Sequence, residues 1–149
     1  MEASLQLKNY HVIETIYKND PFFGDTDYEV SPRFMLNIDV DPNSIERAIV
    51  GLGIELGDEK LEKVPHYIKA RIIGMFEFVS SETVPEEQIM QFYKVNAVAI
   101  LFPYLRSLIT DISSKGNAPA IILPTINIVA LMEQIESETK KLDDIQRAP

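Results

Sequence analysis

Three segments of the chain alternate apolar and polar residues with the period of two that is typical of a half-buried β-strand. The apolar positions fall at every second residue within residues 34–40, 48–56 and 68–78. Polar turns join the segments, the first turn at Pro42 and the second over residues 57–65. Consecutive strands joined in this way favour an antiparallel meander.

An earlier segment, residues 5–17, also has strand character, but its alternation is irregular. Its apolar residues divide between two parities, with Leu5, Leu7, Ile13 and Tyr17 on one and Tyr10, Val12 and Ile16 on the other. Either both faces of this strand are partly covered, or a β-bulge moves the side chains from one face to the other. With the meander, this segment predicts a four-stranded antiparallel sheet.

The longest apolar run lies at residues 96–131 and predicts two helices joined by a connector. The first helix is expected to stop at Gly116. Pro103 has no N–H to donate and clashes with the carbonyl four residues earlier, so we expect a kink or a break near Ala99. A separate short helix, capped by Thr83, should precede the long one. Helices packed on one face of an antiparallel sheet define an α+β fold.

Apolar residues cover more than one stripe of the long helix, which indicates that the helix is buried on two sides. The sheet can cover one side, and a second copy of the chain is our hypothesis for the other. The expected interface residues are Val95, Ala99, Phe102, Leu105 and Ile109.

The chain has 149 residues, of which 46% are hydrophobic, and this suits a single domain over residues 1–149. It has no cysteine, which excludes disulfides and thiolate metal sites and fits a reducing compartment. The formal net charge of −9 would repel phosphate backbones, so nucleic acid is not an expected partner. We expect a cytoplasmic protein, because no apolar window reaches membrane-spanning length and the polar N-terminus shows no targeting signal.

Signals for catalysis are weak. His11 and His66 lie in or beside strands without a neighbouring nucleophile or metal-ligand pattern. Turn formation and helix capping explain the carboxylate pairs. We therefore expect no catalytic residue, metal or cofactor. One alternative is an enzyme, such as a thioesterase-like α+β protein that uses Asp39 or Glu55 as a base, and another is a purely structural oligomer.

The loop over residues 19–32 is rich in Asp, Gly and Pro, yet it holds Phe22, Phe23 and Tyr28. These rings either cap the core, which we favour because apolar atoms are common at protein surfaces, or line an exposed binding surface. The apolar candidates elsewhere in the chain include Phe34, Tyr104 and Met132. In combination they favour binding of extended polypeptide, because Met and Phe side chains repack around varied partners.

At the long apolar run the sequence resembles the SecB family of protein-export chaperones. The matching residues are Asn96, Ile100, Leu101, Phe102, Pro103, Tyr104, Arg106, Ile109, Gly116, Pro119, Leu123, Asn127 and Leu131. Collinear matches upstream are Ile16, Tyr17, Asp20, Phe23, Pro32, Gly74 and Phe76. The resemblance therefore spans most of the chain.

The resemblance implies a four-stranded sheet with helices, assembled through the long helix as a homotetramer, a dimer of dimers. It implies an ATP-independent holdase that keeps precursor polypeptides unfolded for export and passes them to the SecA motor. The implied client-binding groove comprises Phe22, Phe23, Tyr28, Phe34, Leu36, Ile38, Tyr104, Ile128 and Met132. The implied contact for SecA is Asp20.

Three positions depart from the family pattern. Val30 stands where the family usually has a tryptophan before the second strand, and Lys69 stands where it offers an acidic side chain to SecA. Pro124 directly follows Leu123, so this proline is displaced. These departures favour, as an alternative, a SecB-like chaperone dedicated to one client, such as an antitoxin.

Overall fold

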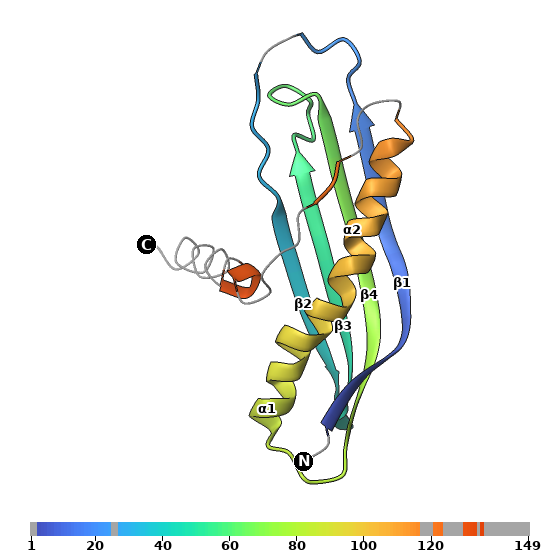
Figure 1. Cartoon of the computed structure of the whole chain (residues 1–149), viewed down its shortest axis with the longest axis vertical. Helices are drawn as coiled ribbons and strands as arrows, with labels where there is room; N and C mark the ends of the chain where they lie inside the picture. The colour runs from blue at the N-terminus through green and yellow to red at the C-terminus, as the bar shows by residue number, and fades with distance from the viewer. Residues whose placement is uncertain (1–2, 25–26, 117–120, 124–129, 134, 136–149) are drawn as a thin grey trace.

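A computed structural model describes residues 3–24, 27–116, 121–123, 130–133 and 135. The first half is a four-stranded sheet of β1 (Ala3–Asn19), β2 (Arg33–Asp41), β3 (Ser44–Gly57) and β4 (His66–Ser80). The strands lie in the order β1-β4-β3-β2, so β1 and β2 form the two edges (Figure 1). A long helical run lies diagonally over one face of the sheet, which we call the helix face; the opposite one is the open face. The predicted α+β fold is confirmed.

The meander predicted for the last three strands is confirmed as well. β2 pairs with β3, and β3 with β4, in antiparallel register. Leu52 in β3 is aligned with Leu36 on one side and with Ile72 on the other, so the apolar positions of all three strands share the helix face. β1 extends the sheet by pairing with β4 along its whole length.

Two bulges explain the irregular alternation of β1. Its pairing with β4 shifts register at Lys8 and again at Ile13. Each shift adds one residue to β1 and so moves the following side chains to the opposite face. Leu7, Val12 and Tyr17 consequently all lie on the helix face despite their different parity.

One continuous helical run follows the sheet, made of α1 (Glu86–Gln91), the π-helical η1 (Phe92–Ala97) and α2 (Val98–Ser114). The expected separation into a short and a long helix is therefore wrong. Thr83 is also not the N-cap, because Pro85 occupies that position without a side-chain hydrogen bond. The positive end of the helix dipole is instead matched by the acidic first turn of α1.

Of the kink or break expected near Ala99, the break is excluded, because α2 continues through Pro103. A proline in a helix interior costs about 3 kcal/mol in isolation. Packing against the sheet offsets that cost, since most helix stability in proteins comes from an apolar face that is buried. The departure from regular α-helix lies earlier, in η1, at residues 92–97.

The core lies between α2 and the central strands β3 and β4. Leu101, Leu105 and Ile109 of α2 are fully buried there. Gly74 of β4 permits this close approach, because a Cβ atom at Gly74 would lie 2.9 Å from the Cδ2 atom of Leu101. The helix ends at Ser114, close to the stop predicted at Gly116.

By length and composition, the helical run Glu86–Ser114 could cross a membrane. The expectation that no apolar window would reach this length is therefore wrong. In the fold the same run supplies core side chains, including the fully buried Tyr93 and Val98. A core helix of a sheet protein meets the same criterion as a membrane span, because both carry long apolar stretches.

After α2, the structure describes a connector at residues 121–123 and helical residues at 130–133 and 135. A helix after the connector was predicted, and part of it is seen. The described residues do not include Pro119, Pro124, Asn127, Ile128 or residues 136–149.

Candidate functional site

The apolar row of β2 is incompletely covered, because β2 is an edge strand and α2 packs over β3 and β4. Leu36, Ile38 and Val40 point to the helix face but stay half-buried. Phe34 is the exception, at 5% exposure, and its ring centroid lies 6.1 Å from that of Phe102 in α2. We call Leu36, Ile38 and Val40 the β2 border. Of the predicted groove residues, Phe34 contributes to the core and the other two β2 residues remain accessible.

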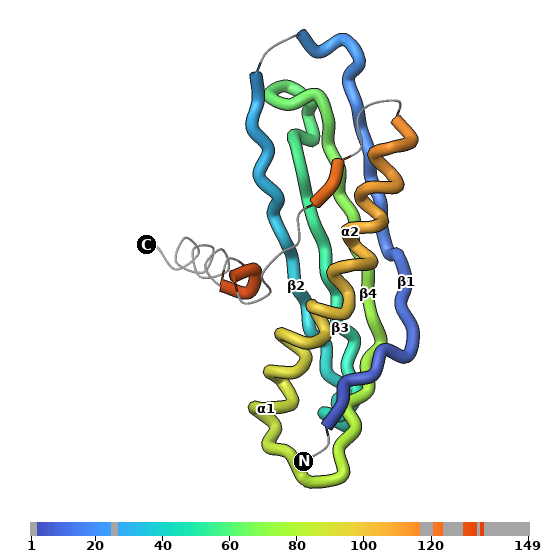
Figure 2. The backbone as a smooth tube through the Cα atoms, viewed as in Figure 1, coloured from blue at the N-terminus to red at the C-terminus, as the bar shows by residue number. Residues whose placement is uncertain are grey.

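The segments after α2 lie near this border. In Figure 2, residues 121–123 lie between α2 and β2, and helical residues 130–133 lie on the β2 side of the sheet. Leu123, Leu131 and Met132 are buried in the main core. Met132 therefore contributes to the core and has little exposed surface. Ile122 of the connector is 75% exposed. An accessible apolar side chain therefore sits on the segment that leads to the edge.

The rings of the first loop form a partly open cluster, which we call the aromatic arm: Phe22, Phe23 and Tyr28. Phe22 is 92% exposed. Tyr28 lies edge-on to both Phe23 and His66, with ring centroids 6.3 and 5.7 Å away. Burial lowers the pKa of His66, so its ring is neutral near pH 7. Of the two interpretations of this loop, the exposed surface fits Phe22 and Tyr28, whereas Phe23 is half-buried against Tyr28.

Tyr104 lies on the opposite side of the helix face. Its ring packs on Tyr10 of β1, with centroids 4.5 Å apart. Both rings are about two-fifths exposed, and Val12 and Ile13 beside them are 48% exposed. We call these four residues the β1 border. Tyr104 is thus separated by the width of the sheet from the β2 residues with which it was grouped, and Tyr10 and Val12 were not in the predicted site.

The five predicted interface residues divide between two sides of the helical run. Phe102, Leu105 and Ile109 are buried against the sheet of the same chain. Val95 is half-buried and Ala99 is exposed. Only the last two therefore have surface to offer a second copy. The hydrophobic pattern identified buried positions without showing which partner buries them.

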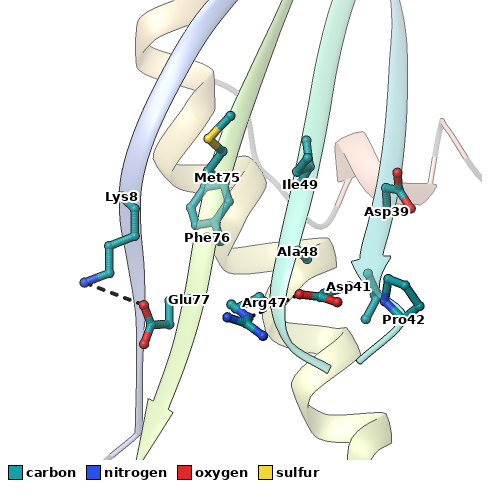
Figure 3. A pocket seen from close by; sticks show the side chains of 11 residues that line it. Lys8, Asp39, Asp41, Pro42, Arg47, Ala48, Ile49, Met75, Phe76 and Glu77 are labelled. Carbon is teal, nitrogen blue, oxygen red and sulfur yellow. Dashed lines mark ion pairs between the residues drawn. The ribbon is translucent and has the colours of Figure 1, made fainter. Parts of the chain in front are cut away.

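The open face of the sheet carries a hollow of about 350 Å³ beside the β2–β3 turn (Figure 3). Its apolar lining includes Ile49 and Met75. Two ion pairs border it: Lys8 Nζ lies 3.8 Å from Glu77 Oε2, and Arg47 Nε lies 3.2 Å from Asp41 Oδ2. The rim charges are thus largely neutralised by each other, and the hollow is shallow and mixed in character.

Neither Asp39 nor Glu55, the two candidate bases of the enzyme alternative, lies in a catalytic arrangement of the described residues. Asp39 lines the rim of the open-face hollow. Glu55 forms an ion pair with Arg33 and accepts a 2.5 Å hydrogen bond from the Tyr67 hydroxyl. Among the described residues, no three His, Asp or Glu side chains are grouped to hold a metal ion. The accessible features are apolar borders and aromatic rings, which define a binding protein.

Asp20, the implied contact for SecA, and Lys69, which replaces an acidic contact of the family, both interact with other residues of this chain. The Asp20 Oδ1 atom accepts a hydrogen bond from the Phe22 amide at 2.9 Å, so this side chain orders the start of the aromatic arm. Lys69 Nζ lies 3.4 Å from Glu14 Oε1 across the sheet. The charge at Lys69 is thereby partly offset by its own neighbour.

Comparisons with known proteins agree with this description. The family model for preprotein translocase subunit SecB matches residues 14–139. An uncharacterised protein of Methanocaldococcus jannaschii is 32% identical over 142 residues, which are 91% of this chain and 86% of that protein. The protein-export protein SecB of Anaplasma phagocytophilum is 30% identical over 100 residues, 64% of this chain and 63% of its own.

One solved structure shares the fold. It is a SecB-like chaperone of Mycobacterium tuberculosis, in complex with a peptide from an antitoxin. The TM-score is 0.66 at 17% sequence identity, over 82% of this chain and 90% of that one. The arrangement of sheet and helix is thus found in a chaperone of very different sequence.

The chain belongs to the SecB family. Members of this family are soluble chaperones and not enzymes, which confirms the expectation that the protein has no catalytic role.

Proposed function

We propose that this protein is an ATP-independent holdase that binds unfolded polypeptide along the β2 border, with the aromatic arm as a second contact. The observation that carries the proposal is the half-buried apolar row on an edge strand. Such a strand offers unpaired backbone groups together with apolar side chains at every second residue. An extended client can add to the edge through main-chain hydrogen bonds and place its own side chains against the apolar row.

The energetics favour clients with apolar segments. Burying apolar surface contributes about 25 cal/mol per Å², from which the cost of ordering an extended chain is subtracted. Leu36 and Ile38 are already partly covered, so a client completes an existing apolar contact. Phe22 is free to change its contacts, because it is almost fully exposed. We propose that Phe34, Ile128 and Met132 form the floor and the far wall of the client-binding groove.

We propose two client ranges that the same surface can serve. The first is a set of precursor polypeptides held in the cytoplasm for export, with transfer to SecA through a surface that includes Asp20. The second is a single dedicated client, which the antitoxin peptide bound to the M. tuberculosis chaperone supports. Pull-down of bound polypeptides from native cytosol separates them, because many recovered clients indicate export and one indicates a dedicated role.

We also propose that the chain assembles as a tetramer, a dimer of dimers. The exposed apolar residues of the β1 border and the solvent side of α2 at Ala99 are proposed as its contacts. Two large rings and two aliphatic side chains exposed together form a patch that a second copy can cover. Light scattering at micromolar concentration tests this, and a monomer would contradict it.

The chaperone proposal is tested with reduced, alkylated lactalbumin, which cannot refold. Calorimetry without nucleotide should show binding of this polypeptide and none of its native form. The protein at a stoichiometric ratio should also slow aggregation of a denatured precursor. If lactalbumin produces no heat and aggregation is unchanged, the proposal is wrong.

A further inference from the structure

A row of polar side chains crosses all four strands on the open face, at the end where the aromatic arm leaves the sheet. The row runs from Lys18 in β1 through Tyr67 in β4 and Glu55 in β3 to Arg33 in β2. These residues line one hollow of about 560 Å³ together with the turn that begins at Asp58. We call Lys18, Tyr67, Glu55 and Arg33 the clasp.

Each neighbouring pair in the clasp is in contact. Lys18 Nζ lies 5.7 Å from the centroid of the Tyr67 ring. The Tyr67 hydroxyl donates to Glu55 Oε2 at 2.5 Å, and Glu55 Oε1 forms an ion pair with Arg33. Glu55 therefore holds a partner with each carboxylate oxygen, one on either side of its own strand.

The hydrogen bond between Tyr67 and Glu55 is the strongest contact in the clasp. Tyr67 is only 2% exposed, and burial raises the pKa of its hydroxyl, so it remains a donor at neutral pH. A hydrogen bond to an ionised acceptor is stronger than one between neutral groups. The Glu55 side chain is 20% exposed, against 65% for Arg33. Loss of Glu55 would leave a nearly buried hydroxyl without its acceptor.

The clasp joins the two ends of the segment that carries the aromatic arm. Lys18 lies two residues before Asp20, where that segment begins, and Arg33 is the first residue of β2, where the segment ends. In the sheet these two residues belong to opposite edge strands. The sheet ladders set the distance between these two residues, and the clasp adds side-chain contacts at both ends of the arm.

We infer that Glu55 is a positioning residue for client binding, which fixes the base of the aromatic arm through Tyr67 and Arg33. This inference rests on the proposed function. A held base limits the positions that Phe22 and Phe23 can take, so less conformational freedom is lost when a client binds. Releasing the base should weaken client binding without removing any group that touches the client.

The matched control is a second cross-strand ion pair on the same face. Arg47 and Asp41 join β3 to β2 at the opposite end of the sheet, beside the β2–β3 turn. Their side chains are 62% and 28% exposed, which is close to the values for Arg33 and Glu55. Arg47→Gln therefore removes a similar surface ion pair, far from the aromatic arm.

The experiment uses the full chain with Gly24→Trp as a reporter background, because a Cβ at Gly24 has no neighbouring atom within 4 Å and Gly24 is not among the residues proposed to touch the client. The chain has no tryptophan, so the new side chain is the single emitter. Fluorescence anisotropy then reports how firmly the arm is held, independently of any client. In this background Glu55→Gln, Arg33→Gln, the double variant and Arg47→Gln are compared for anisotropy, unfolding by urea and calorimetric affinity for alkylated lactalbumin.

Glu55→Gln should lower the anisotropy and weaken lactalbumin binding by about fivefold, a coupling of the size measured for groups in one network. Arg33→Gln should act in the same direction, and the double variant should have no larger effect than the stronger single one, because all three remove the same ion pair between Glu55 and Arg33. Arg47→Gln should change neither quantity. Unchanged anisotropy and affinity in Glu55→Gln, with the reporter protein still binding lactalbumin, would overturn the inference. Absence of binding in the wild-type chain and in the reporter protein would instead count against the proposed function, and the anisotropy comparison would still test the clasp.

Discussion

The two edges of the sheet present apolar side chains on the same face, yet they differ in what surrounds them. The β2 border is a short row of half-buried aliphatic side chains that pack against the core. The β1 border is a pair of packed rings with two exposed aliphatic neighbours, on a strand of 17 residues with two bulges. Apolar chemistry alone therefore does not distinguish a client surface from an assembly surface. The segments beside each border and the regularity of its strand distinguish the two kinds of surface.

Regularity matters because an added strand needs an even ladder of hydrogen bonds. β2 follows β3 in unbroken register from Arg33 to Val40. β1 is interrupted at Lys8 and Ile13, and bulges discourage further pairing at an edge. We therefore assign extended clients to β2 and side-chain packing between copies to β1. Substitutions at each border test that assignment.

The strongest test places charges on the β2 border. The double variant Leu36→Asp and Ile38→Asp should weaken lactalbumin binding by about a hundredfold, because each burial of an aliphatic side chain contributes about 1.5–3 kcal/mol. Asn37→Asp is the control, since Asn37 lies between them and faces the open side of the sheet. Calorimetry measures the affinities. Equal weakening by Asn37→Asp would show that charge, and not the apolar row, matters.

Charges on the β1 border should change assembly instead of client affinity. Tyr10→Asp and Tyr104→Asp should each shift the protein toward smaller species, because a carboxylate in a buried contact costs several kcal/mol. His11→Asp serves as the control, because His11 is exposed and lies on the open face of β1. Multi-angle light scattering gives the mass of each variant. A loss of client binding with assembly intact would reverse the assignment of the two borders.

Gly74→Ala tests whether the two borders depend on one core. The added Cβ would lie within 3.0 Å of atoms in Phe76, Leu101 and Leu7. Overpacking of this kind typically costs about 1–3 kcal/mol of unfolding free energy. Gly51→Ala is the control, where the closest atoms are 3.6 Å away or more. Urea unfolding compares them, and equal stability would mean that the helix can move away from the sheet without cost.

The smallest effect concerns the bond that ties η1 to the β2–β3 hairpin. The Tyr93 hydroxyl donates to the Ile45 carbonyl at 2.6 Å, and Tyr93→Phe should cost about 1 kcal/mol. Burial raises the pKa of Tyr93 to about 12 from its ordinary value of 10.0. A raised folded-state pKa means that its contribution is complete below pH 10 and is lost between pH 10 and about 12.

Tyr93→Phe should therefore flatten the decrease in stability over that interval. Urea unfolding of both proteins at several alkaline pH values measures the difference. If the stability of both proteins decreases in parallel as the pH rises, other groups cause the loss of stability at alkaline pH. Tyr93→Phe should affect the β1 and β2 borders equally, because this hydrogen bond holds the start of the helical run against the sheet.

Much of the fold could be predicted from local pattern. The three regular strands and their meander follow from strict alternation, since a half-buried strand has a period of two. The irregular parity of residues 5–17 allowed two explanations, and pairing with β4 selected the bulges. The helix and its stop near Gly116 also followed from apolar content and a terminating glycine. These features depend on residues close together in the chain.

The errors arose where a local signal competed with packing. Thr83 and Pro103 carry ordinary helix-start and helix-break signals, but the sheet supports one continuous run from Glu86 to Ser114. Phe102, Leu105 and Ile109 were correctly expected to be buried, yet their burial is by their own sheet. A hydrophobic pattern records that a side chain avoids water and not which surface covers it.

The strands, the helical stretch and the resemblance to one chaperone family could be predicted from the chain, because they depend on spacing and residue type. The pairing of Tyr104 with Tyr10 at one edge, and the position of Leu36 and Ile38 at the other, follow only from the fold. It also brought Lys18, Tyr67, Glu55 and Arg33 from four strands into one row. The physical reason is the sheet order, which places β1 beside β4 and so separates strands that are consecutive in the sequence.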